Sequence, residues 1–103
     1  MLNFGQLSQQ PLEPLNNVRF TSRRVLKLTN IEFKLLTYLI RNAGRPLSKR
    51  SLLTEVWSPD HENTPYLPKV HIQHLRKKIE RDPGNPQYIL TERGIGYKFA
   101  PPR

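Results

Sequence analysis

The sequence predicts a single α+β domain in which a small antiparallel sheet comes first, three helices follow, and a β-hairpin closes the chain. Three observations predict this order: short apolar–polar alternations over residues 2–28, apolar residues at helical spacing over 29–81, and a second alternation around two glycines within 87–100. The length of 103 residues is that of one compact domain, so 1–103 is taken as a single unit.

The first part of the chain is expected to form strands, because residues 2–28 show no helical period. The stretches LNFGQL and VRF alternate apolar with polar residues, and VRFTSRRVLKL is typical of a hairpin. Between them, QQPLEPLNN carries two prolines and the pair Asn16-Asn17, which predicts a turn.

The clearest helix signal is LTNIEFKLLTYLIRNAG. Thr29 followed by Glu32 forms a capping box, and Asn42 and Gly44 supply a stop signal. A second short helix is expected after Ser48, a candidate N-cap, with an apolar face of Leu52, Leu53, Val56 and Trp57. Two short helices joined by GRPL suggest a helix-turn-helix-like arrangement.

The third expected helix, from about Leu67 to Arg81, combines an apolar stripe with many cations. At about 100° per residue its apolar residues share one face, which should pack on the core: Ile72, Leu75 and Ile79. The opposite face carries Val70, Gln73, His74 and Lys77. Both edges between these faces are basic or hydrogen-bonding: Lys69, His71, Arg76 and Lys78.

The charge balance indicates a polyanionic partner. Lys plus Arg number 17 against 8 acids, which gives a net charge of +9. The third helix would fit a DNA major groove, with basic edges on phosphates and with Gln, His and Val facing base edges. A membrane surface is disfavoured because the apolar stripe is needed by the core. A solvated charged face would also explain the cations of this helix, and that reading stays open.

The C-terminal stretch QYILTERGIGYKF predicts a second hairpin. Gly94 and Gly96 bracket Ile95, which allows a tight tip, and Arg93 can project from it into a groove or onto a phosphate.

Several classes of protein are disfavoured by composition. The absence of cysteine excludes disulfides and cysteine-based zinc sites, and no window of about 18 apolar residues exists for a membrane span. The start MLNFGQLSQQ lacks a basic n-region, so a cytoplasmic location is expected rather than secretion. No nucleophile–base pair or glycine-rich phosphate loop is visible, so neither enzymatic activity nor a cofactor or small-molecule ligand is expected.

Two alternatives to DNA binding are less favoured. His71 and His74 lie three apart and could share a zinc ion with His61, but Arg76 and Lys77 beside them disfavour a further cation. A protein- or RNA-binding module on the same fold is the second alternative. RNA is disfavoured because the major groove of A-form RNA is too narrow for a helix.

Three motifs together resemble a known family. In order and spacing, LTNIEFKLLTYLIRNAGRPLSKRSLLTEVW, VHIQHLRKKIE and YILTERGIGYKF resemble the OmpR/PhoB-type winged-helix effector domain of two-component response regulators, and NFGQL resembles its opening strand. The resemblance implies a winged helix-turn-helix fold with a four-stranded N-terminal sheet and a C-terminal wing. It also implies sequence-specific binding to double-stranded DNA, usually as a tandem dimer on direct repeats.

The resemblance also implies roles for individual residues. Base reading falls on Lys69, Val70, Gln73 and His74. Contacts to the DNA backbone fall on Trp57, His71, Arg76, Lys78, Thr91 and Tyr97, with Arg93 as the wing arginine, and Lys77 is expected to join them. Replacing Lys78 is then expected to weaken binding to all sequences alike. The loop Ser58–Thr64 corresponds to the segment that can touch RNA polymerase.

The sequence also departs from the family pattern. His74 stands where an arginine is common, and Lys69 where an acid is common. Pro65 and Pro68 predict that the third helix begins near Leu67, about one turn late, because proline is tolerated only in the first turn. No receiver domain is recognisable, so the chain is expected to be an excised C-terminal domain rather than a stand-alone regulator.

Overall fold

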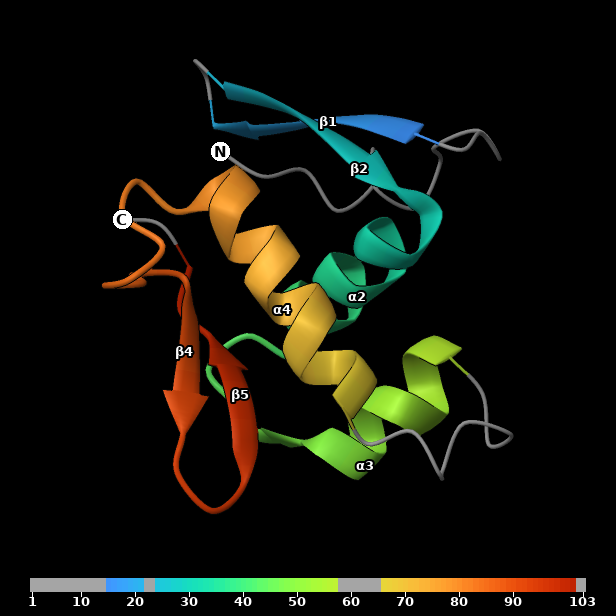
Figure 1. Cartoon of the computed structure of the whole chain (residues 1–103), viewed down its shortest axis with the longest axis vertical. Helices are drawn as coiled ribbons and strands as arrows, with labels where there is room; N and C mark the ends of the chain where they lie inside the picture. Colours follow the sequence, from blue (N-terminus) through green and yellow to red (C-terminus); the bar gives the residue numbers. More distant parts are fainter. Residues whose placement is uncertain (1–14, 22–23, 58–65, 102–103) are drawn as a thin grey trace.

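The computed structural model describes residues 15–21, 24–57 and 66–101. Figure 1 shows a hairpin of two strands across one end of a helical core, with a second hairpin beside the long helix α4. In chain order the elements are β1 (Leu15–Thr21), β2 (Arg24–Thr29), α2 (Asn30–Arg41), β3 (Leu47–Ser48), α3 (Lys49–Leu52), the π-helical turn η1 (Leu53–Trp57), α4 (Tyr66–Ile79), β4 (Ile89–Glu92) and β5 (Gly96–Phe99).

The strands form two separate antiparallel sheets. β1 pairs with β2, with Val18 opposite Leu26 and a register shift between Arg19 and Thr21. The second sheet has the order β3-β5-β4, so the short β3 ties the C-terminal hairpin to the start of α3. β4 is an edge strand of this sheet, and within the part of the chain that the structure describes one side of its backbone has no partner strand.

The core lies where the N-terminal hairpin, the helices and the C-terminal hairpin meet. Alternate residues of β1 and β2 face it, as the period of two in strands requires. The largest fully buried side chains come from every layer: Phe20, Leu28, Leu35, Leu36, Leu39, Leu52, Ile72, Leu75, Ile79, Ile89 and Phe99. One contiguous cluster therefore supports both α4 and the C-terminal hairpin.

The expected caps are confirmed. The Thr29 hydroxyl accepts from the Glu32 N–H and the Glu32 carboxylate accepts from the Thr29 N–H, which closes the capping box of α2. Asn42 is the C-cap of α2, and Gly44 follows with a φ of 84°. The Ser48 side chain accepts from the Ser51 N–H at 3.0 Å and caps α3.

Several boundaries differ from the sequence-based expectation. Asn16 and Asn17 do not form a turn, because they pair with Leu28 and Lys27 in the β1–β2 ladder. The second helix is not one α-helix, since α3 has four residues and continues as the π-helical turn η1. The predicted strand LNFGQL and the prolines at 11 and 14 lie outside the described residues, and two strands of the expected four-stranded sheet are described.

The helix α4 begins at Tyr66 and ends at Ile79, against an expected span from Leu67 to Arg81. Pro68 is its third residue and is buried, so its missing N–H falls in the first turn, where no helical acceptor is available. Its last two carbonyls accept from β2, because Arg24 donates to the carbonyl of Ile79 at 2.7 Å and to that of Lys78 at 2.6 Å. No helix among the described residues is long and apolar enough to cross a membrane.

Candidate nucleic-acid interface

The helix α4 has the two faces that its sequence predicts. Ile72, Leu75 and Ile79 are fully buried, which fixes the rotation of the helix on the core. The opposite side is open, with exposed side chains at Lys69, Val70, Gln73, His74 and Lys77. The hydrogen-bonding residues expected to read bases therefore lie on the accessible face.

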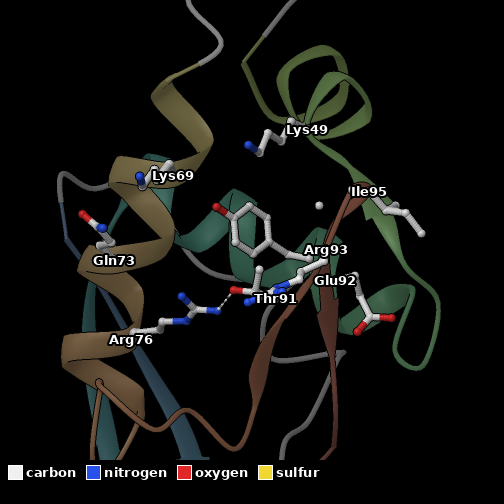
Figure 2. Close-up of a pocket in the computed structure, with 11 residues that line it drawn as sticks. Lys49, Lys69, Gln73, Arg76, Thr91, Glu92, Arg93 and Ile95 are labelled. Atoms are coloured by element: carbon white, nitrogen blue, oxygen red, sulfur yellow. Dashed lines mark hydrogen bonds between the residues drawn. The ribbon is translucent and has the colours of Figure 1, made fainter.

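A groove runs between α4 and the β4–β5 hairpin. It has a volume of about 540 Å³ and takes its walls from α4, from the hairpin and from the start of α3 (Figure 2). Four of its lining residues are cationic and one is acidic, which makes it a positively charged channel: Lys49, Lys69, Arg76 and Arg93, with Glu92. Gln73, Thr91 and Tyr97 also line it.

Lys49 is a candidate contact that the sequence-based reasoning missed. It is exposed at the first position of α3, and Figure 2 shows its side chain across the groove from Lys69. A lysine in the first turn of a helix is electrostatically unfavourable, because the helix N-terminus carries partial positive charge. That unfavourable placement, directly after an N-cap serine, is the sequence signal that could have found it.

Arg76 is held inside the domain rather than projecting freely. Its Nε and Nη2 donate to the Ile89 carbonyl at 3.0 and 2.7 Å, and Nη2 also donates to the Thr91 hydroxyl at 2.9 Å. The guanidinium lies 5.7 Å from the centroid of the Tyr97 ring. Burial lowers the pKa of Arg76 from its usual value, and the charges of Tyr97 and Glu80 oppose this.

Tyr97 lies beneath the groove rather than on its rim. Tyr97 is only 5% exposed. Burial raises the pKa of its hydroxyl group, and the positive charge of Arg76 opposes that rise. The predicted contact of Tyr97 with a DNA backbone stays a prediction. Its present neighbours indicate that it supports Arg76 and the floor of the groove.

Lys78 is directed away from the front of α4. Its Nζ lies 2.6 Å from Oε1 of Glu32 and donates to the Lys27 carbonyl at 2.9 Å. Its expected phosphate contact is not tested by this geometry and stays a prediction. Lys77, which is exposed on the front of α4, is better placed for such a contact.

Three aromatic rings form a row that runs from Trp57 at the end of η1 to His71 and His74 of α4. The ring centroids of Trp57 and His71 lie 5.1 Å apart, and those of His71 and His74 lie 5.7 Å apart, both pairs in an edge-to-face arrangement. Trp57 also packs against the core, and Nδ1 of His71 lies 3.0 Å from the Leu67 carbonyl. Within the described residues no three potential ligands gather for a metal ion, and His61 lies outside them, so the zinc alternative stays untested.

The tip of the C-terminal hairpin is tight and exposed. Gly94 has a φ of 78°, a conformation that favours glycine, and the Ile95 N–H donates to the Glu92 carbonyl at 3.0 Å. Arg93 is exposed beside it, and Ile95 is 51% exposed. The structure thus brings Arg93, Thr91 and Tyr97 to the same groove as Lys69, Gln73 and Arg76. The loop Ser58–Thr64 lies outside the described residues.

A three-helix core with an exposed basic third helix and an adjoining C-terminal hairpin defines a winged helix-turn-helix domain. The family model described as "Transcriptional regulatory protein, C terminal" matches residues 23–99, which is most of the chain. The chain belongs to this family, the OmpR/PhoB-type effector domains.

Curated relatives agree with this assignment. The chain is 49% identical over 73 residues to the KDP operon transcriptional regulatory protein KdpE of Escherichia coli, covering 70% of this chain and 32% of the relative. It is 46% identical over 77 residues to the DNA-binding response regulator MtrA of Mycolicibacterium smegmatis, covering 75% and 34%. The matched part of the chain thus spans about a third of the length of these relatives.

Solved structures show the same fold. The response regulator DrrB of Thermotoga maritima, described as an OmpR/PhoB homolog, superposes with a TM-score of 0.71 at 30% identity, covering 87% of this chain and 43% of that one. The DNA-binding domain of RstA from Klebsiella pneumoniae, solved in complex with the RstA box, gives 0.72 at 25% identity, covering 88% and 95%.

Proposed function

We propose that this chain binds duplex DNA sequence-specifically as the C-terminal output domain of a two-component response regulator, and so regulates transcription in the cytoplasm. The α4 helix lies in the major groove and the β4–β5 wing reaches the adjacent minor groove. The single observation that carries the proposal is the exposed polar front of α4 beside a basic groove shared with the wing.

The front of α4 carries the chemistry for reading bases. Gln73 can pair with adenine through its amide, and the methyl groups of Val70 can contact a thymine methyl. His74 and Lys69 can donate to the acceptors of guanine. All four side chains are exposed, so they can approach base edges without rearrangement of the core.

The cations around this front supply affinity that does not depend on sequence. Lys49, Lys69 and Arg93 line the groove between helix and wing, and Lys77 stands on the open face of α4. Neutralising phosphates releases counterions, so binding should weaken steeply as salt rises. Trp57, His71 and Thr91 complete the proposed backbone contacts. Arg76 can join them through Nη1, because its Nε and Nη2 already donate to Ile89 and Thr91.

A similar domain that was solved bound to DNA supports this proposal. The RstA domain is similar over nearly its whole length and was solved on its own DNA box. By the same resemblance we propose that two copies bind direct repeats in tandem and that the loop Ser58–Thr64 contacts RNA polymerase. Those two assignments rest on the family resemblance alone.

Selection of bound duplexes from a random DNA library tests the proposed function. We expect enrichment of one short motif, or of two copies about one helical turn apart. The matched control is the double variant Gln73→Ala/His74→Ala, which keeps the formal charge and should bind DNA without enriching that motif. Equal enrichment by the control would contradict base reading by α4. Preference for duplex RNA in a competition assay would instead favour an RNA-binding module.

A further inference from the structure

Among the described residues, the outer side of the edge strand β4 is held by a side chain of α4 and by one that directly follows it, rather than by another strand. Register pairs Ile89 with Phe99, and the Ala100 N–H donates to the Tyr88 carbonyl at 2.7 Å. Because antiparallel pairs alternate between bonded and non-bonded positions, the N–H and C=O of Ile89 point away from β5. Both groups are nevertheless satisfied, one by Arg76 of α4 and the other by Glu80, the residue that follows α4.

Glu80 accepts from the backbone just before and at the start of β4. Its Oε1 accepts from the Gln87 N–H at 2.7 Å and from the Tyr88 N–H at 3.2 Å. Its Oε2 accepts from the Tyr88 N–H at 3.1 Å and from the Ile89 N–H at 2.9 Å. One buried carboxylate therefore binds three successive backbone donors.

Arg76, one helical turn before Glu80, binds the other backbone polar group of Ile89, its carbonyl. Its two bonds to the Ile89 carbonyl complement the bond from Glu80 to the Ile89 N–H. A third bond, to the Thr91 hydroxyl, extends the contact two residues further along β4. The donor and the acceptor of Ile89 are thus both fixed by side chains four residues apart, one in the last turn of α4 and one just after it.

The position of Glu80 would be electrostatically unfavourable without these hydrogen bonds. The residue is 3% exposed, and it follows directly on the C-terminal end of α4, where helix carbonyls disfavour negative charge. The nearby Arg76 and the three backbone donors offset those costs. A purely apolar side chain could fill the space but could not fix the direction of the strand.

We propose that Glu80 is a positioning residue that, together with Arg76, sets the orientation of the β4–β5 wing relative to α4, so that helix and wing bind DNA as one rigid unit. Apolar packing of Ile89 and Ile79 holds the two elements together. Directional hydrogen bonds at the start of β4 fix their mutual angle, and that angle places Arg93 at the far end of the hairpin. The role in DNA binding rests on the proposed function.

A double-mutant cycle on the full chain tests this role. Arg93→Ala should weaken binding to the selected duplex at least about fivefold in the wild type, as loss of a charged DNA contact does. In the Glu80→Gln background the same change should cost less than about twofold, because the wing no longer presents Arg93 correctly. Glu55→Gln is the matched control, since Glu55 is exposed on η1 and its loss changes net charge equally. Stoichiometric titration corrects each Kd for unfolded protein.

An equal cost of Arg93→Ala in all three backgrounds would overturn the proposal, because Glu80 would then merely support the fold. If Glu80→Gln does not fold, Glu80→Asp serves, since it keeps the charge but withdraws the carboxylate by one methylene. A reduced cost of Arg93→Ala in that background supports the proposal, and an unchanged cost contradicts it.

A measurement without DNA separates this proposal from the proposed function. Residual dipolar couplings of backbone amides in α4 and in the wing should fit one alignment in the wild type and in Glu55→Gln. In Glu80→Gln or Glu80→Asp the wing amides should depart from the alignment that still fits α2 and α4. An unchanged wing alignment in both Glu80 variants would overturn the positioning role, even if the wild type binds DNA specifically. If the wild type selected no DNA motif, the proposed function would be wrong. The residual dipolar couplings would still decide whether Glu80 sets the orientation of the wing.

Discussion

The ammonium of Lys78 lies 2.6 Å from Oε1 of Glu32, the same carboxylate oxygen that closes the capping box at the start of α2. This pair joins α4 to α2, and the bond from Lys78 to the Lys27 carbonyl extends it to β2. Burial raises the pKa of Glu32, but the hydrogen bonds from Lys78 and Thr29 and the charge of Lys78 outweigh burial and leave it below its usual value.

The ion pair predicts a pH-dependent stability. Because the folded-state pKa of Glu32 is lowered, its ionised form contributes stability above the ordinary value of 4.5, and this is lost as pH falls through the folded-state value. We expect Lys78→Met to lower the free energy of unfolding by about 1–3 kcal/mol near neutral pH, since it leaves Glu32 buried without that partner. The loss should shrink as the pH falls from the ordinary value of 4.5 through the lower folded-state pKa of Glu32.

Chemical denaturation across a pH series measures this effect. Lys77→Met is the matched control, because Lys77 is exposed on the same helix and should change stability by less than about 0.5 kcal/mol. A loss from Lys78→Met that stays constant down to low pH would show that the ion pair with Glu32 is not its cause.

The same two lysines should differ in DNA binding. Lys77→Ala should weaken binding to all duplexes alike and flatten the dependence of log K on log salt by about one unit, as loss of one phosphate contact does. Lys78→Met should change that slope by less, because its ammonium is engaged with Glu32 and Lys27. Fluorescence anisotropy at a series of salt concentrations gives both slopes. The reverse ranking would favour Lys78 over Lys77 as the phosphate contact.

The exposed imidazole of His74 should specify a base. Replacing His74 by Ala should relax preference at one position of the selected site, with a loss of about 1–3 kcal/mol in discrimination there. Preference at the other positions should be kept. Repeating the library selection with this variant measures the change. Uniform weakening at every position would mean that His74 contacts the backbone instead.

Gly96 should be irreplaceable for packing reasons. A methyl group at this position would overlap the Leu47 carbonyl, where β5 runs against β3. Gly96→Ala should therefore cost at least about 2 kcal/mol of unfolding free energy, because backbone atoms cannot move aside easily. Gly84→Ala is the control, since its methyl group would meet only the Asp82 side chain at ordinary contact distance. Equal stability of the two variants in thermal denaturation would show that a methyl group at position 96 does not clash with the Leu47 carbonyl.

Much of the fold could be predicted because its signals are local. The capping box of Thr29 and Glu32, the N-cap Ser48 and the stripe of Ile72, Leu75 and Ile79 all depend on residues a few positions apart, and all are confirmed. Asn16 and Asn17 were assigned wrongly, because pairing with β2 overrides their local turn preference.

The candidate site was predicted less completely because its geometry depends on distant residues. The open face of α4 follows from periodicity, but the inward engagement of Arg76 and Lys78 depends on Ile89 and Glu32, which are far away in sequence. Helical spacing predicts the face of the helix from which a long side chain projects. It does not predict which residue the charged end of that side chain contacts. Lys49 was missed for the same reason, since its proximity to Lys69 depends on how α3 packs.

The most direct test of the central claim is the ratio of dissociation constants for the selected duplex and a scrambled duplex of equal length, measured at low and at near-physiological salt. Sequence-specific reading by α4 predicts that both constants rise with salt while the ratio stays at about a thousandfold or more. A ratio near one at both salt concentrations would mean that the net charge of +9 alone holds the DNA, and would contradict the proposed function.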